Sequence, residues 1–163
     1  MLHTWSGVVL MSILVSCSPP SQDGQDIKRV IRAAVEASPT VFGRLFKASK
    51  VGDEIPASQA FTALIPPNKS IESIMQNSGH TLESFASSSK GKDFVRNHLL
   101  TKEVDIRVSN VYVNLLGKQV TITVDESPCR SVFNGVGVRI CSEHPDTNLL
   151  NGSIYFLSDI LPF

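Results

Sequence analysis

Hydrophobic residues recur at helical spacing from the start of the charged part of the chain to Leu100. The first such stretch carries its apolar residues on one face and charged residues on the other, which predicts an amphipathic helix. Its apolar residues are Ile27, Val30, Ile31, Ala34 and Val35. This helix should end before Ser38, because a residue that precedes proline disfavours the helical region of backbone space. Ser38 is then expected to cap a second helix with Pro39 at its first position. That helix would bury Val41 or Phe42, Leu45 and Phe46.

Shorter segments follow the second helix. The apolar run over 60–65 ends at Pro66, so it predicts a strand that leads into a turn. Asn68 or Ser70 is expected to cap one short helix and Thr81 another, since their side chains accept hydrogen bonds from free backbone N–H groups.

A polar loop is expected over 87–92, before a last helical face that carries Phe94, Val95, His98 and Leu99. After this face the apolar spacing changes from helical to alternating. Val120, Ile122 and Val124 alternate with polar residues, which predicts a strand with one buried face. Further strands are expected at 106–108, 111–113, 131–140 and 154–157. Helices followed by strands predict an α+β fold with a largely antiparallel sheet, and 163 residues suit one domain.

The first 22 residues contain no Asp, Glu, Lys or Arg. Gly7–Val15 is apolar and has the length of a signal-peptide core, which is too short to span a bilayer. Leu14–Cys17 is similar to the lipobox of bacterial lipoproteins, whose cysteine becomes the acylated first residue of the mature chain. We expect a signal peptide over 1–17, a polar tether over 18–25 and one domain over 26–163. The protein would then be an outer-membrane or cell-surface lipoprotein, and cleavage near Ser16 without acylation would instead release a secreted protein.

The chain has three cysteines and equal numbers of basic and acidic residues, 15 of each. Once Cys17 is acylated or removed, Cys129 and Cys141 remain as an even pair in an oxidising compartment. This favours a disulfide over two free thiols. Zero net charge without a basic cluster argues against a nucleic-acid partner, because such binding depends on neutralising phosphates.

The sequence contains no catalytic motif that we recognise. It lacks the G-x-S-x-G elbow of hydrolases and a phosphate-binding loop. The histidines are His3, His80, His98 and His144, and their separation gives no metal-ligand spacing. We therefore expect no enzyme activity, cofactor or metal. A hydrolase would require a hydroxyl beside His80, His98 or His144 in the fold.

Five segments of the chain look like family motifs: Phe61–Ile71, Asn97–Leu100, Leu115–Ile122, Val132–Val136 and Asn151–Pro162. They resemble motifs of the fasciclin domain, and they occur in the order found in that family. Phe61–Ile71 is similar to its first signature motif and Asn151–Pro162 to its second. Asn97–Leu100 resembles the central His motif, while Leu115–Ile122 and Val132–Val136 resemble two conserved stretches that follow it. The resemblance covers about residues 26–163. It implies a β-wedge of about seven strands with helices packed to one side.

The resemblance implies a non-enzymatic adhesion or protein-binding module whose partner is an extracellular protein or matrix component. The binding positions that it suggests are Asn97 and His98 in the central motif, and Asp159 and Ile160 in the second. The alternative for Asp159 is a carboxylate that accepts backbone hydrogen bonds. The alternative for His98 is a buried histidine bonded to backbone.

Two further questions stay open at this point. The alternative function is a small-ligand carrier of the periplasm or cell surface, with a pocket between the helices and the wedge. Asn68 and Asn151 each begin a glycosylation sequon, but both lie inside the signature motifs, where a structural use is expected.

Overall fold

The computed structural model describes residues 31–124, 129–133, 137–141, 147–149 and 152–163. Residues 31–37 are helical and lead into a layer of helices. That layer comprises α2 (Val41–Ser49), the short 3-10 helix η1 (Val51–Glu54), α3 (Asn68–Asn77), α4 (Leu82–Ser87) and α5 (Ser89–Asn97). Strand β1 (Phe61–Ile65) is inserted between η1 and α3, at the apolar run that predicted a strand.

The remaining strands complete two sheets of four among the described residues. They are β2 (Leu99–Leu100), β3 (Asn110–Val113), β4 (Gln119–Val124), β5 (Arg130–Phe133), β6 (Gly137–Ile140), β7 (Thr147–Leu149) and β8 (Gly152–Phe156). The first sheet has the order β2-β1-β8-β7 and the second β3-β4-β5-β6. The pair β1–β8 is parallel, and the other described pairs are antiparallel. The expected α+β class is confirmed.

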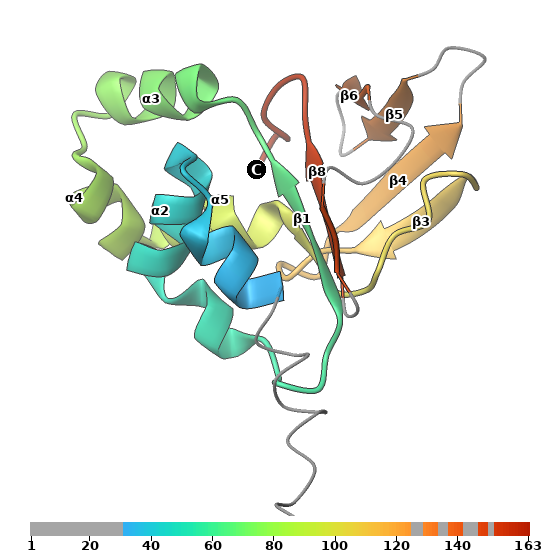
Figure 1. Cartoon of the computed structure of the whole chain (residues 1–163). Helices are drawn as coiled ribbons and strands as arrows, with labels where there is room; N and C mark the ends of the chain where they lie inside the picture. The colour runs from blue at the N-terminus through green and yellow to red at the C-terminus, as the bar shows by residue number, and fades with distance from the viewer. Residues whose placement is uncertain (1–30, 125–128, 134–136, 142–146, 150–151) are drawn as a thin grey trace, which may run out of the picture.

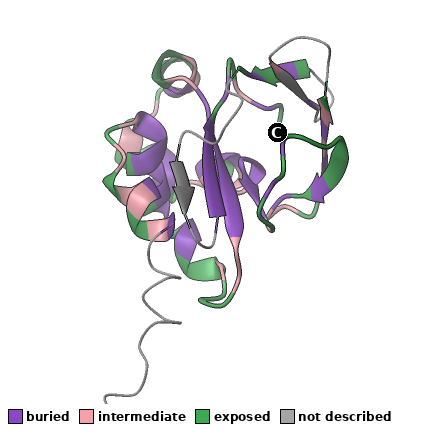
Figure 2. Cartoon of the chain, turned by 45° about the vertical axis from the view of Figure 1, so that its right-hand side comes forward, coloured by how far each residue is buried: buried purple, intermediate pink, exposed green. Residues whose placement is uncertain are grey.

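The first sheet lies between the helices and the second sheet (Figure 1). Its two central strands are buried almost along their whole length (Figure 2), because both faces are covered. Successive residues of β1 belong to different cores: Ala63 packs with the helices, whereas Leu64 packs with the second sheet. The alternation of side chains along a strand therefore connects two hydrophobic cores through one sheet.

The second helix begins later than expected. Its N-cap is Thr40 rather than Ser38, and the Thr40 hydroxyl accepts a hydrogen bond from the Gly43 N–H at 3.0 Å. Pro39 therefore precedes the helix instead of occupying its first position. Phe42, Leu45 and Phe46 are all buried, as the helical spacing predicted, and so is Val41.

The expected cap of α3 is also wrong. Pro67 occupies the N-cap position, and no side chain caps this helix. The Asn68 side chain instead accepts a hydrogen bond from the Val41 N–H at 2.9 Å, at the start of α2. The Asn68 side chain of α3 thus accepts a hydrogen bond from a free N–H group of α2 rather than from one of its own helix. The expected Thr81 cap of α4 is confirmed by the bond from the Ser84 N–H.

The polar stretch over 87–92 is helical for most of its length and not a loop. Ser88 ends α4 and caps α5 through the Gly91 N–H. Gly91 permits this sharp corner, because a Cβ atom there would overlap the carbonyl of Phe85. Capping by a serine side chain outweighs the polar, glycine-containing composition that suggested a loop.

Two strand predictions also differ from the structure. Residues 106–108 form a turn, in which the Asp105 carboxylate accepts a hydrogen bond from the Arg107 N–H at 2.9 Å. The segment 131–140 was expected as one strand and forms two antiparallel strands, β5 and β6. Cys129 and Cys141 lie one residue beyond the paired residues Arg130 and Ile140, and they form the expected disulfide.

Candidate functional site

Residues 157–163 follow β8 and cross from the strands to the helices; we call them the strap. The Leu157 N–H donates to the Ile65 carbonyl at 2.8 Å, which continues the contact between β8 and β1. The Ser158 N–H donates to the Arg139 carbonyl at 2.9 Å, and the Ser158 hydroxyl accepts from the Arg139 N–H at 3.0 Å. Ile65 at the end of β1 and Arg139 in β6 therefore hold the start of the strap.

Asp159 is the exposed acidic residue of the strap. Its Oδ1 atom accepts a hydrogen bond from the Ser70 hydroxyl at 3.0 Å and another from the Ile160 N–H at 2.8 Å. Ser70 belongs to the first turn of α3, so the signature-like segments at 61–71 and 151–162 meet through these side chains. Ile160 is half-buried and packs against the helical core. The carboxylate is thus held in a fixed position at the surface.

His98 lies directly beneath the strap and is fully buried. It is the C-cap residue of α5, and its Nε2 atom accepts a hydrogen bond from the Leu161 N–H at 3.0 Å. The other nitrogen, Nδ1, donates to the Phe94 carbonyl at 2.8 Å, and these two partners together define the neutral tautomer. Burial, which disfavours the charged imidazole, lowers the pKa of His98 to about 4, although the Phe94 carbonyl acts in the opposite direction.

Asn97 is also fully buried and binds the backbone of the strap. Its side-chain amide donates to the carbonyls of Leu161 and Pro162, at 3.3 and 3.1 Å. Together, Asn97 and His98 satisfy the N–H and C=O groups of Leu161. Two consecutive side chains at the end of one helix therefore hold the strap by its main chain.

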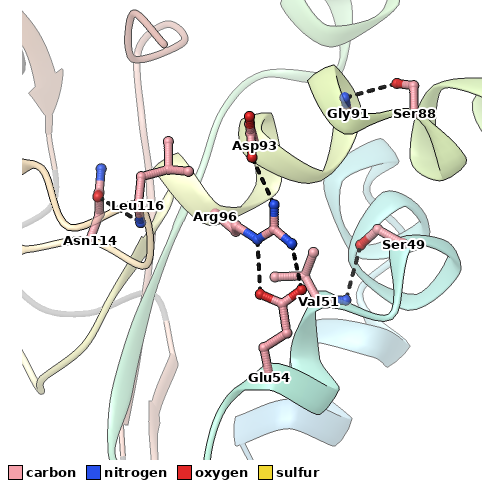
Figure 3. Close-up of polar contacts among 9 residues, drawn as sticks. All are labelled: Ser49, Val51, Glu54, Ser88, Gly91, Asp93, Arg96, Asn114 and Leu116. Carbon is pink, nitrogen blue, oxygen red and sulfur yellow. Dashed lines mark hydrogen bonds and ion pairs between the residues drawn. The ribbon is translucent and has the colours of Figure 1, made fainter.

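Asn114 extends this network to the second sheet. Its amide donates to Oδ1 of Asn97 at 3.0 Å, and its oxygen accepts from the N–H group of Lys118. The same oxygen accepts from the Leu116 N–H (Figure 3). Sequence reasoning did not identify this residue. Its signal was present, since Asn114 lies three residues before Gly117, whose φ of 75° marks a tight turn of the kind that asparagine stabilises.

The opposite side of α5 is bound to η1 by charged residues. Arg96 donates to both carboxylate oxygens of Glu54, at 2.8 and 2.6 Å, and to Asp93 at 2.7 Å (Figure 3). The hydrogen bonds from Arg96 lower the pKa of the Glu54 carboxyl, and those to Glu54 and Asp93 raise the pKa of Arg96. The helix that carries Asn97 and His98 is therefore fixed on two sides.

The structure brings the four suggested binding residues into one region but exposes them unequally. Asn97 and His98 face the interior, where they bind the backbone of the strap. Asp159 is exposed, and Ile160 is half-buried beside it. Only the Asp159 side of this region is accessible to a partner in this conformation. Cys17 and Asn151 lie outside the described residues.

A hydrolase would require a hydroxyl beside a histidine, and the structure places one beside His80 but none beside His98. Both nitrogens of His98 are bonded to backbone groups, so no hydroxyl lies beside this ring. Nδ1 of His80 lies 3.1 Å from the Ser84 hydroxyl, which in turn donates to the Thr81 carbonyl. No carboxylate among the described residues is hydrogen-bonded to His80, so the pair lacks the third group of a catalytic triad. His3 and His144 lie outside the described residues.

Neither a metal centre nor a membrane span is found in the part of the chain that the structure describes. Within it, no three or more His, Cys, Asp or Glu side chains are grouped as metal ligands would be. No helix in the same residues is long and apolar enough to cross a bilayer. The disulfide between Cys129 and Cys141 is typical of oxidising, exported environments.

Comparison with known proteins leaves the family open. No protein-family model matches this sequence, and no curated protein matches it either.

Proposed function

We propose that this protein is an exported, fasciclin-like binding module that attaches to an extracellular protein or matrix component through the surface around Asp159. It acts by binding and not by catalysis. A lipid on Cys17 holds it at the cell surface, and residues 18–25 separate the lipid from the folded domain. Two acyl chains give a far more stable anchor than one, because each buried methylene contributes about 0.8 kcal/mol.

The arrangement of the two signature-like segments supports the family part of this proposal. They are far apart in the sequence, yet β1 and β8 pair in parallel, with Phe61 opposite Gly152 and Ile65 opposite Phe156. Gly152 suits this position, because a Cβ atom there would overlap the carbonyl of Phe61. Helices packed on one side of a strand-rich half also fit a fasciclin-like wedge.

The observation that carries the binding proposal is the state of Asp159. Its carboxylate is exposed, but Ser70 and the Ile160 N–H fix its orientation through Oδ1. A preoriented surface carboxylate binds a cationic partner group at lower entropic cost than a freely rotating one. The half-buried Ile160 adds apolar contact beside it.

The test is adhesion of protein-coated beads to a surface of reconstituted extracellular matrix. Beads that carry the wild-type protein should be retained, and Asp159→Asn should reduce retention at least fivefold because the charge is removed while the hydrogen bonds to Ser70 and Ile160 are kept. Asp105→Asn is the matched control, since Asp105 is exposed but sits beside Arg107 on a different segment. Equal retention of wild type and Asp159→Asn, or equal loss in both variants, would overturn the role of Asp159.

A further inference from the structure

The contact between His98 and the strap depends on the protonation state of one atom. Nε2 accepts the Leu161 N–H and therefore carries no hydrogen. Nδ1 already donates to the Phe94 carbonyl, so an added proton has only Nε2 to occupy. Protonated Nε2 would place two N–H groups against each other, and the bond to Leu161 would be lost.

Among the described residues, none that surrounds His98 offers a negative charge to compensate for a positive one. The ring lies between the aromatic rings of Phe94 and Phe42, with centroids 4.6 and 5.9 Å away. On α5, Arg96 is bonded to both Asp93 and Glu54. Lys90 is exposed and Lys92 half-buried, and neither perturbs the His98 ring.

In the described residues of α2, β1 and the strap, no acidic side chain faces the His98 ring either. Arg44 and Lys47 on α2 are exposed, β1 has no titratable side chain, and Asp159 on the strap points to Ser70. Within the described part of the chain, burial lowers the pKa of His98 and the Phe94 carbonyl raises it, and no charged side chain is among the causes. A protonated ring must therefore reach water to be stabilised.

We propose that His98 is an acid-sensitive latch: the neutral imidazole holds the strap against the helices, and protonation of Nε2 releases the strap around Leu161. Release withdraws Leu161 from the second core, while the helices and the second sheet stay folded. Moving the strap would uncover Nε2, because this atom is bonded to the Leu161 N–H of the strap. Leu157 and Leu161 are buried in the second core, but the other strap residues are exposed or half-buried. A segment with fewer buried contacts than the core strands opens at a lower free energy than they do.

The change in the strap's opening equilibrium with pH follows from the difference between the two pKa values of His98, with the strap closed and with it open. The pKa of His98 is about 4 with the strap in place, and its ordinary value is 6.5, to which it returns when the ring meets water. The strap is therefore held most firmly above pH 6.5, loosens as the pH falls towards 4, and loosens no further below that. Because each pH unit in this window changes the opening equilibrium tenfold, release becomes up to about 300-fold more favourable.

The experiment is hydrogen exchange of the full chain at single-residue resolution, at pH 7 and at pH 3.5, with each rate corrected for intrinsic exchange. The protection of the Leu161 amide should fall by up to about 300-fold at pH 3.5, while the amides of β4 keep theirs. If Leu161 keeps its protection, the latch does not exist. If β4 loses as much protection as Leu161, acid unfolds the whole domain and the proposal is overturned.

Two variants distinguish protonation of the His98 ring from the protonation of other groups at acid pH. His98→Gln keeps an oxygen that can accept the Leu161 N–H but does not titrate, so its strap should lose no more protection at pH 3.5 than β4 does. His80→Gln removes a half-buried histidine that does not contact the strap in the described structure, and it should behave like the wild type. If His98→Gln does not fold, NMR titration of the wild-type His98 ring decides the question. The ring and the Leu161 amide must then change over the same pH range, and a ring that titrates with Leu161 still protected overturns the latch.

The latch also bears on adhesion, because Asp159 lies on the strap. That consequence rests on the proposed function, and binding should then weaken at acid pH. The exchange measurement needs no partner, so failure of the latch and failure of the binding role are distinguishable.

Discussion

Three buried polar side chains define how the strap is held: Asn97, His98 and Asn114. A buried amide or imidazole destabilises a fold unless its hydrogen bonds are made, and here each has named partners. The central His motif was expected to hold a partner or to bind backbone. The observed bonds of His98 match the second description, since both nitrogens contact main-chain groups.

At the residue scale, Asn114→Ala should lower the free energy of unfolding by about 3 kcal/mol. The substitution leaves the N–H groups of Leu116 and Lys118 without their acceptor and Asn97 without its donor. Urea denaturation measures the change. Asn77→Ala, at the exposed end of α3, is the control and should change stability by less than about 0.5 kcal/mol. A similar loss in both variants would contradict the role given to Asn114.

At the scale of elements, helix ends account for most of the differences between expectation and structure. Spacing of apolar residues predicts where a helix buries its face, so Phe42, Leu45 and Phe46 were found correctly. The first residue of a helix depends on which of several nearby acceptors reaches the free N–H groups. For α2 one acceptor comes from Thr40 and another from Asn68 of a different helix, a contact that exists only in the folded chain.

The role of Asn68 gives a test at this scale. Asn68→Ala should destabilise the protein by about 1 kcal/mol, because the Val41 N–H loses its acceptor at the start of α2. Asn68→Asp keeps an acceptor oxygen and adds a favourable charge at a helix N-terminus, so it should be at least as stable as the wild type. Thermal or urea unfolding distinguishes the two. Equal destabilisation by Ala and Asp would rule out a capping role for this side chain.

The spacing of apolar residues predicts where strands form but not which strands pair. Alternation over Gln119–Val124 predicted a strand that the structure confirms, and the apolar run before Pro66 did the same for β1. The parallel pairing of β1 with β8 joins residues about ninety positions apart, and nothing in either segment alone specifies it. At the candidate site, the positions of Asn97, His98 and Asp159 came from motif resemblance, while their unequal exposure emerged only from the fold.

At the scale of the whole molecule, the disulfide of the α+β domain fits the export that we propose for this chain. The disulfide closes the ends of β5 and β6, and the backbone of Arg139 in β6 binds Ser158 of the strap. Chain-entropy arguments assign about 3 kcal/mol to a disulfide that closes a loop of this size. Such a bond persists in an oxidising compartment, which fits export of the chain.

The measurement that tests this account most directly is the intact mass of the mature protein, taken from cells that express the full chain. We predict a chain that begins at Cys17, carries a diacylglycerol or triacyl adduct there, and is two hydrogens lighter than its reduced form because Cys129 and Cys141 are bonded. A chain that begins after Cys17 without lipid would contradict the anchor. A chain that still begins at Met1, with all three cysteines reduced, would contradict export itself.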